Sequence, residues 1–211
     1  GGAVTLTVAG GNSATVGGAV TVGTEGDSTI VVNNTTGDGG AIDVTFSSTI
    51  GTSAAKLGTL TMTAGDTTFS GNVFVNGTLA AADLGVMNFD ANVTAATLTI
   101  GQDDATFAGD IDATTINVAA AEDMTFDGTG NQSITGTITA GADGTGALTN
   151  NNTGGQVVFN SAVGSSAANE VGTITTIAST DTRFKSTVDA GDEEAGDGRV
   201  RGLFIPRQPG R

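Results

Sequence analysis

VTFSSTIGTSAAKLGTL at residues 44–60 returns as VVFNSAVGSSAANEVGTI at residues 157–174. The match continues on both sides, where residues 33–37 correspond to residues 151–155 and residues 66–73 to residues 181–188. A stretch of about forty residues is therefore duplicated within one chain, which indicates an architecture of repeated units that pack on their neighbours.

A shorter unit lies inside the long repeat and consists of a phenylalanine followed four positions later by a β-branched residue. Its copies are Phe46 to Ile50, Phe69 to Val73, Phe89 to Val93, Phe107 to Ile111, Phe159 to Val163 and Phe184 to Val188. A seventh copy begins at Phe126, and there the sequence Gly-Thr-Gly-Asn-Gln-Ser after Asp127 delays the branched residue until Ile134. Between Phe69 and Phe126 the phenylalanines that begin these copies recur at nearly equal intervals, at positions 69, 89, 107 and 126. This spacing predicts an all-β fold, a parallel β-solenoid (β-helix) of about 19–20 residues per coil.

The composition suits a narrow solenoid interior. The chain has 34 glycines and no Trp, Tyr, Cys or His, and its two prolines lie among the last six residues. Apolar residues alternate with threonine in short runs such as Leu98-Thr99-Ile100, which is the period-2 pattern of a half-buried strand. We expect the phenylalanines to stack inside the coils as a ladder of Phe69, Phe89, Phe107 and Phe126, with Val93 and Ile111 also inside.

Charged residues are distributed unevenly along the chain. Residues 1–182 contain 17 acidic residues and a single base, Lys56, whereas the segment 183–211 contains five acidic and six basic residues. A polyanionic body repels nucleic acid and anionic lipid, so neither is an expected partner. No stretch approaches the roughly 18 apolar residues of a membrane span, and membrane insertion is not expected either.

The sequence suggests two regions. Residues 1–188 are predicted to form one continuous solenoid, and residues 189–211 an acidic linker followed by a basic and apolar tail. The tail is either an unstructured terminus or a docking strand that adds to the edge of a neighbouring copy. In the second case the residues of the contact are Arg201, Leu203, Phe204 and Ile205.

Catalysis is not expected. Without His or Cys, most catalytic triads, zinc sites and thiol mechanisms are excluded, and a pair of carboxylates is what remains. The dense acidic groups of the body are Asp103-Asp104 and Asp110-x-Asp112. Clefts that cleave sugars also depend on aromatic platforms and basic residues, and here there is no Trp or Tyr and a single Lys in residues 1–182, so the sequence predicts neither an enzyme nor an organic cofactor.

The same four aspartates, Asp103, Asp104, Asp110 and Asp112, are candidate calcium ligands, because calcium takes oxygen ligands from carboxylates and turn carbonyls. The alternative is that they solubilise turns and block lateral association of strands. The chain contains neither a series of calcium-binding nonapeptides nor an EF-hand loop.

Threonine pairs offer a third possibility. Thr-x-Thr occurs at Thr5/Thr7, Thr59/Thr61/Thr63, Thr97/Thr99, Thr137/Thr139 and Thr173/Thr175. On a flat solenoid face this is the pattern of β-helical ice-binding proteins, in which it recurs once per coil. The gaps here are uneven, which favours threonine chosen for its β-propensity.

The Phe-x-x-x-Val/Ile unit, the VGSSAANEVGTIT segment and the Gly-Thr-Leu-Thr strands together resemble the repetitive passenger regions of large bacterial surface proteins. This group includes autotransporter and filamentous-haemagglutinin-like adhesins and some surface-layer or matrix-fibre proteins. The resemblance covers residues 30–188 and is one of repeat pattern, and the tail after Val188 does not match it. It implies secretion and an extended rod at the cell surface with a mechanical or adhesive task.

Two functions follow as hypotheses. The first is an extracellular structural subunit that assembles with copies of itself into a filament, matrix fibre or surface layer. The second is the stalk or binding module of an adhesin or phage fibre, which recognises a surface glycan or ice. Self-assembly of the purified chain would distinguish the first hypothesis from the second.

Overall fold

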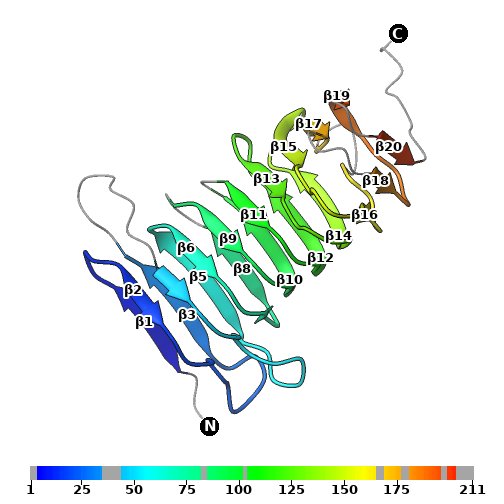
Figure 1. Cartoon of the computed structure of the whole chain (residues 1–211). Coiled ribbons are helices and arrows are strands. Elements are labelled where there is room, and N and C mark those ends of the chain that lie inside the picture. Colours follow the sequence, from blue (N-terminus) through cyan, green and yellow to red (C-terminus); the bar gives the residue numbers. More distant parts are fainter. Residues whose placement is uncertain are drawn as a thin grey trace.

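The computed structural model describes residues 4–34, 44–81, 85–101, 104–164, 169–176, 181–195 and 199–202, with side chains described as far as residue 190. All regular structure in these ranges is β-strand, arranged in two parallel sheets that run side by side along the molecule (Figure 1). These ranges contain no helix that is long and apolar enough to cross a membrane.

We refer to the two sheets as sheet I and sheet II. Sheet I contains, in spatial order, β1 (Thr5–Ala9), β3 (Thr29–Asn33), β5 (Thr59–Ala64), β8 (Thr78–Ala81), β10 (Val93–Ile100), β12 (Ile111–Val118), β14 (Gln132–Ala140), β16 (Val157–Phe159), β18 (Asp181–Phe184) and β20 (Arg199–Gly202), and β7 (Val73–Phe74) also pairs with β10. Sheet II contains, in the same direction, β2 (Ala14–Val16), β4 (Val44–Phe46), β6 (Thr67–Phe69), β9 (Met87–Phe89), β11 (Ala105–Phe107), β13 (Asp123–Phe126), β15 (Thr145–Asn150), β17 (Val171–Thr176) and β19 (Ala190–Ala195).

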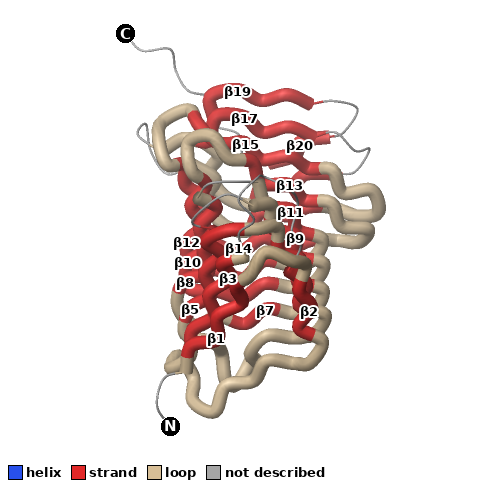
Figure 2. The backbone as a smooth tube through the Cα atoms, turned by 90° about the vertical axis from the view of Figure 1, so that its left-hand side faces the viewer, coloured by secondary structure: helices blue, strands red, loops and turns tan. Residues whose placement is uncertain are grey.

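The chain alternates between the sheets, and each strand pairs in parallel with the strand one coil away (Figure 2). This is the predicted all-β parallel solenoid. The coil length follows from the register: Phe107 pairs with Phe89 on one side and Phe126 on the other, so successive phenylalanines mark successive coils, as their spacing predicts. Thr29 pairs with Thr59, a wider interval in the sequence, so this coil near the beginning of the chain is longer, whereas Phe184 and Gly202 at the other end are again one short coil apart. Turns absorb the extra residues because they lie outside the ladder.

The long strands of sheet I bend, which gives the coil three sides. In β10 the buried residues are Val93 and Ala95 and then Leu98 and Ile100. The buried positions thus change from odd to even residue numbers after Ala96. A strand that keeps facing the same interior across such a change must turn a corner. We refer to the part of sheet I in register with Val93 as its leading half and the part in register with Leu98 as its trailing half.

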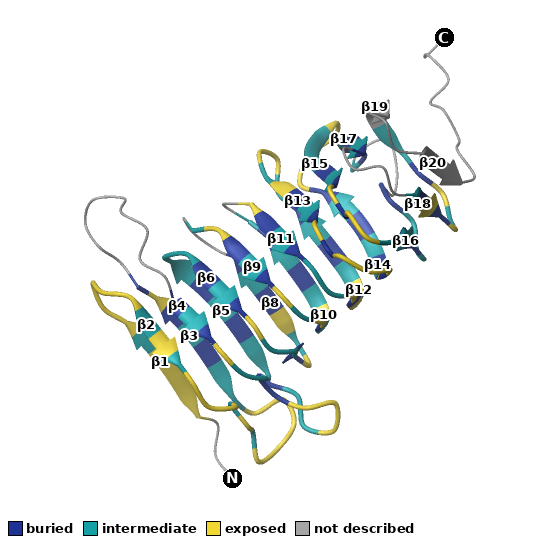
Figure 3. Cartoon of the chain, viewed as in Figure 1, coloured by how far each residue is buried: buried dark blue, intermediate teal, exposed yellow. Residues whose placement is uncertain are grey.

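The predicted phenylalanine ladder is confirmed. The rings of Phe69 and Phe89 stack at 4.8 Å, and those of Phe89 and Phe107 at 4.9 Å with planes 5° apart. The contact between Phe107 and Phe126 is longer, 6.5 Å, and tilted by 32°. Val93 and Ile111 are also buried, as expected. The interior is thus a continuous apolar column between the sheets (Figure 3).

The phenylalanine column changes sheet after Phe126. Phe159 and Phe184 pair with Ile134 and with each other on the leading half of sheet I, not on sheet II. Phe159 still touches Phe126, with an edge-to-face ring contact at 5.2 Å. The register positions that follow Phe126 on sheet II belong instead to Asn150 and Thr176.

The strands also continue past Val188, where the sequence analysis placed an acidic linker. β19 pairs with β17 and β20 pairs with β18, so both sheets extend to the end of the described chain. Apolar periodicity was the wrong criterion here, because a ladder is made by backbone hydrogen bonds and a last strand needs a neighbour on one side only. Arg201 is the register partner of Arg183 in this ladder, while Leu203, Phe204 and Ile205 lie outside the described residues.

Candidate functional site

The first coil exposes the apolar interior. Leu6 belongs to the inward column of sheet I, where its register partner Ile30 is 1% exposed and the next member, Leu60, is 0% exposed. Leu6 itself is 38% exposed, and Val4 is 64% exposed. Each coil of a solenoid is covered by the coils on either side of it. Among the strands that the structure describes, β1 has a neighbour on one side only, and this explains the exposure.

A pocket of about 320 Å³ opens at this end of the molecule. Its apolar lining residues are Val4, Leu6, Val20, Val22, Ile30 and Leu57. Of the described residues in the lining, Asp27 is the one that is charged, and Ser28 and Thr29 add hydroxyl groups. The surface is thus an apolar hollow with an acidic border.

Within the described part of the chain, the same end carries strand edges with no neighbouring strand. β1 is the terminal strand of sheet I, and β2 is the terminal strand of sheet II. At the opposite end the terminal strands are β20 and β19. An edge strand presents unpaired backbone donors and acceptors, which makes it a template for a further strand.

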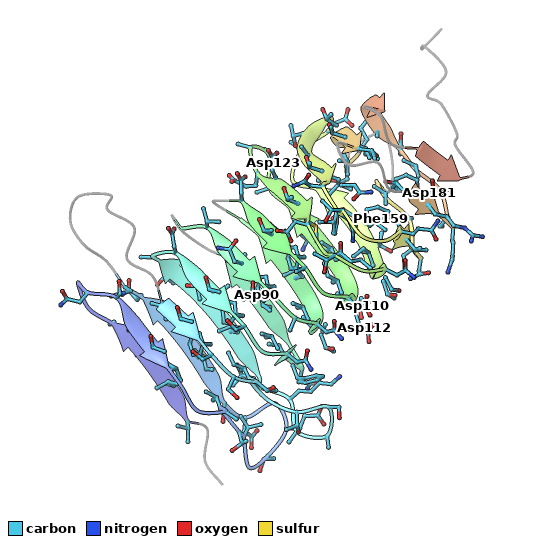
Figure 4. All side chains as sticks on the ribbon, viewed as in Figure 1. Asp90, Asp110, Asp112, Asp123, Phe159 and Asp181 are labelled. Atoms are coloured by element: carbon cyan, nitrogen blue, oxygen red, sulfur yellow. The ribbon has the colours of Figure 1, made fainter. Side chains whose placement is uncertain are left out.

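The predicted acidic group does not come together as one site. Asp110 lies in a turn and Asp112 at an exposed position of β12, whereas Asp123 lies on the far side of the coil (Figure 4). Asp104 lies beside Asp123, and the backbone N–H of Asp123 donates a hydrogen bond to Asp104 Oδ1 at 2.9 Å. Asp103 lies outside the described residues, and within them no three acidic side chains are grouped to hold a metal ion.

The turn carboxylates and amides have a different role, which the sequence analysis missed. Asn72 Oδ1 accepts a hydrogen bond from the Asn92 N–H, Asn92 Oδ1 from the Asp110 N–H, and Asp110 Oδ1 from the Ser133 N–H, at 3.1, 2.9 and 2.8 Å. Each side chain thus holds the backbone of the next coil. The signal in the sequence is a polar residue directly before the branched residue of the short repeat.

Two aspartates have raised pKa values. Partial burial of the Asp123 carboxyl raises its pKa above the ordinary 3.8, and the charge of Asp104 raises it further. Partial burial also raises the pKa of Asp127, with a contribution from the charge of Asp90 and an opposing effect of a backbone hydrogen bond. Stacked carboxylates along a turn therefore repel one another between coils.

The last coils contain a buried polar cluster, which the sequence analysis also missed. Asn152 Nδ2 donates to Gln132 Oε1 at 2.6 Å and to the Gly130 carbonyl at 2.7 Å. Asn150 Nδ2 donates to Thr182 Oγ1, also at 2.6 Å. These side chains are at most 3% exposed. Buried polar groups with their hydrogen bonds satisfied maintain a particular packing, and this cluster locks the last coils together.

The threonines align in columns despite their uneven sequence gaps. The outer face of the trailing half of sheet I carries Thr5, Thr29, Thr59, Thr78, Thr97, Thr115 and Thr137 in register. Turns of different length absorb the gaps, so unevenness in the sequence was no argument against alignment. Sheet II carries a column of its own, in which Thr125, Thr149 and Thr175 are neighbours. The predicted pair Thr173/Thr175 lies there and not on sheet I.

No protein-family model, no curated protein and no solved structure matches this chain. The resemblance to bacterial surface proteins therefore rests on the repeat pattern alone. The fold, the open first coil and the polar columns are the observations from which function has to be argued.

Proposed function

We propose that the chain is a non-catalytic structural subunit, exposed outside the cell, that assembles with copies of itself into a filament, matrix fibre or surface layer. The observation that carries the proposal is the first coil. There the apolar interior and two parallel strand edges are open at the same place. Both features are removed from water when another coil stacks on them.

Three further observations support this proposal. The strands continue through both sheets from β1 to β20, which makes a rod whose coils are linked by backbone hydrogen bonds. The sequence contains no His and no Cys, so these side chains are not available for catalysis. The chain is acidic, with a net charge of −15, and this charge keeps rods apart laterally and leaves their ends as the place of contact.

The test is negative-stain electron microscopy of the purified chain at micromolar concentration, together with light scattering over a dilution series. We expect uniform filaments or sheets that grow with concentration. Isolated short rods at every concentration would overturn the proposal. Samples with millimolar calcium and with a chelator also test whether Asp104, Asp110 or Asp112 contributes to assembly as a calcium ligand.

A second candidate is binding of ice through the outer face of sheet I. It is favoured by the threonine column described above, beside which Thr61, Thr99 and Thr139 stand two positions further along their strands. The column on sheet II argues against it, since β-propensity places threonine on both faces. Ice-affinity partitioning of the chain and of a Thr97→Lys/Thr99→Lys variant tests it, and equal exclusion of both from ice would reject it.

A further inference from the structure

We propose that the open first coil is the acceptor half of a head-to-tail interface and that its occupant is the last coil of a second copy of this chain. This inference rests on the proposed self-assembly and specifies its geometry. It assigns one interface, with β2 of one copy next to β19 of another on sheet II and Val20 next to Gly202 on sheet I.

Strand direction is the first argument. All strand pairs in both sheets are parallel, and both sheets run in the same order from the first coil to the last. A second copy moved along the axis therefore presents β19 to β2 in the same direction as every pair inside the chain. No rotation or reversal of strands is needed to continue the ladder.

Register is the second argument, because the columns of the rod connect its two ends. Thr15 begins a column of sheet II that passes through Thr45 and Thr68 and ends with Thr175 and Glu194. On sheet I the bridge from Val20 to Ile50 begins the column that ends with Phe184 and Gly202. Thr15 and Val20 of one copy thus follow Glu194 and Gly202 of the next copy in their columns.

Apolar surface and charge are the third argument. The hollow around Leu6 and Val20 offers an uncovered interior to the incoming coil. The charged residues of positions 1–34 are Glu25 and Asp27, both acidic, whereas the last coil has three acidic residues in β19 and two arginines in β20. Like charges disfavour a contact between two first coils, and the arginines of β20 are the opposite charges that the last coil offers.

The symmetry of this contact explains a filament. The two surfaces differ, so each copy uses both and leaves one of each free after pairing. Such a head-to-tail contact without a closing rotation forms an open chain of subunits. A contact between identical ends would stop at a dimer.

The test uses engineered cysteines, because the described chain has no free cysteine and the sequence has none at all. Neighbouring parallel strands lie about 4.8 Å apart, within the Cα range of a disulfide. A Thr15→Cys/Glu194→Cys variant should form a ladder of covalent multimers on a non-reducing gel after mild oxidation. The two positions lie at opposite ends of one copy, so they do not close within it (Figure 1).

Each control has a defined meaning. The single variants should stop at dimers, and a Thr15→Cys/Thr125→Cys variant, with its second cysteine in the middle of the rod, should give no ladder. Filaments of the double variant without a disulfide ladder would overturn this interface and leave the self-assembly proposal intact. Absence of both filaments and ladder would overturn the two proposals together.

A matched pair of charge variants gives an independent measurement. Leu6 and Thr7 are neighbours in β1, and both are exposed, but Leu6 belongs to the inward column and Thr7 to the outer face. Leu6→Glu should raise the concentration needed for assembly by more than about tenfold, because the contact would bury an unpaired carboxylate. Thr7→Glu should change it little. Circular dichroism confirms that both rods remain folded, and equal assembly of both would overturn the interface.

Discussion

The two copies of the duplicated segment have the same local structure but occupy different sides of the coil. Phe46 in the first copy lies on sheet II, whereas Phe159 in the second lies on the leading half of sheet I. Leu60 lies on the trailing half of sheet I, and its counterpart Ile174 lies on sheet II. The second copy is thus displaced by one side around the coil.

Local geometry survives this displacement. Val44–Phe46 and Val157–Phe159 have the same alternation of buried and half-buried residues. Gly51 and Gly164, each directly after the branched residue, have φ angles of +68° and +70°. Asn34 and Asn152 each donate from the side-chain amide to a backbone carbonyl of the preceding coil. Near neighbours in the sequence therefore determine strand, turn and inward face.

The side of the coil depends on the preceding coil instead. Between Phe126 and Phe159 the chain completes a coil on sheet II with Asn150, so the next phenylalanine arrives one side later. Its ring still reaches Phe126 across the thin interior. The comparison teaches that two different sides of this coil accept the same strand, and that stacking decides which side it occupies.

Removal of the two aromatic rings should have the largest effect. Phe46 and Phe159 are both almost fully buried, so Phe46→Ala and Phe159→Ala should each lower the free energy of unfolding by about 3–5 kcal/mol. Urea unfolding followed by circular dichroism measures the loss. Thr45→Ala, which changes an outward position, is the control with a small effect. A negligible loss for Phe159→Ala would contradict equivalent packing on the two sides.

Asn150 follows Phe126 in the column on sheet II, and a phenylalanine at this position tests what decides the side of the coil on which a strand lies. If the column on sheet II alone mattered, Asn150→Phe would continue it and stabilise the rod. We expect a loss of about 1–3 kcal/mol, because Phe159 already packs against Phe126 and Asn150 hydrogen-bonds Thr182. The double variant Asn150→Phe/Phe159→Ala should lose less than the sum of the single losses. Stabilisation by Asn150→Phe alone would contradict the expectation.

The two turn glycines should respond alike, with a smaller loss. An added Cβ at Gly51 would collide with the Phe74 carbonyl and one at Gly164 with the Asp189 carbonyl, in addition to the strain of positive φ. Each alanine variant should cost more than about 1 kcal/mol. Gly130→Ala is the control, since open space surrounds that position. Thermal unfolding compares the three, and different effects at Gly51 and Gly164 would show that the copies differ locally.

The pH dependence should be the smallest effect. The pKa of Asp123 is raised in the folded chain, so the folded state binds a proton more readily than the unfolded state. Stability from this group is therefore gained as pH falls from neutral toward 3.8 and lost as pH rises. Asp123→Asn should flatten this part of the profile of melting temperature against pH, and Asp104→Asn should flatten it partly. Parallel profiles for Asp123→Asn and the unchanged protein would contradict this assignment.

Prediction from sequence succeeded where a pattern repeats and failed where contacts cross between coils. The phenylalanine spacing predicted the solenoid and the ring ladder, and the alternation of residues predicted the buried positions Val93 and Ile111. It did not predict that Asp110 holds the next coil through Ser133, or that Asp104 lies beside Asp123. Each of those contacts joins two successive coils, and coils of unequal length hide which residues meet.

By itself the sequence determined the strand as the unit, the inward face of each strand and the stacking of coils, because these depend on period-2 alternation and a regular aromatic interval. The tertiary structure decided the side on which each copy lies, the alignment of the threonine columns and the buried amide cluster. The physical reason is that register between parallel strands is established by contact with the preceding coil, and turns of variable length leave that register free in the linear chain.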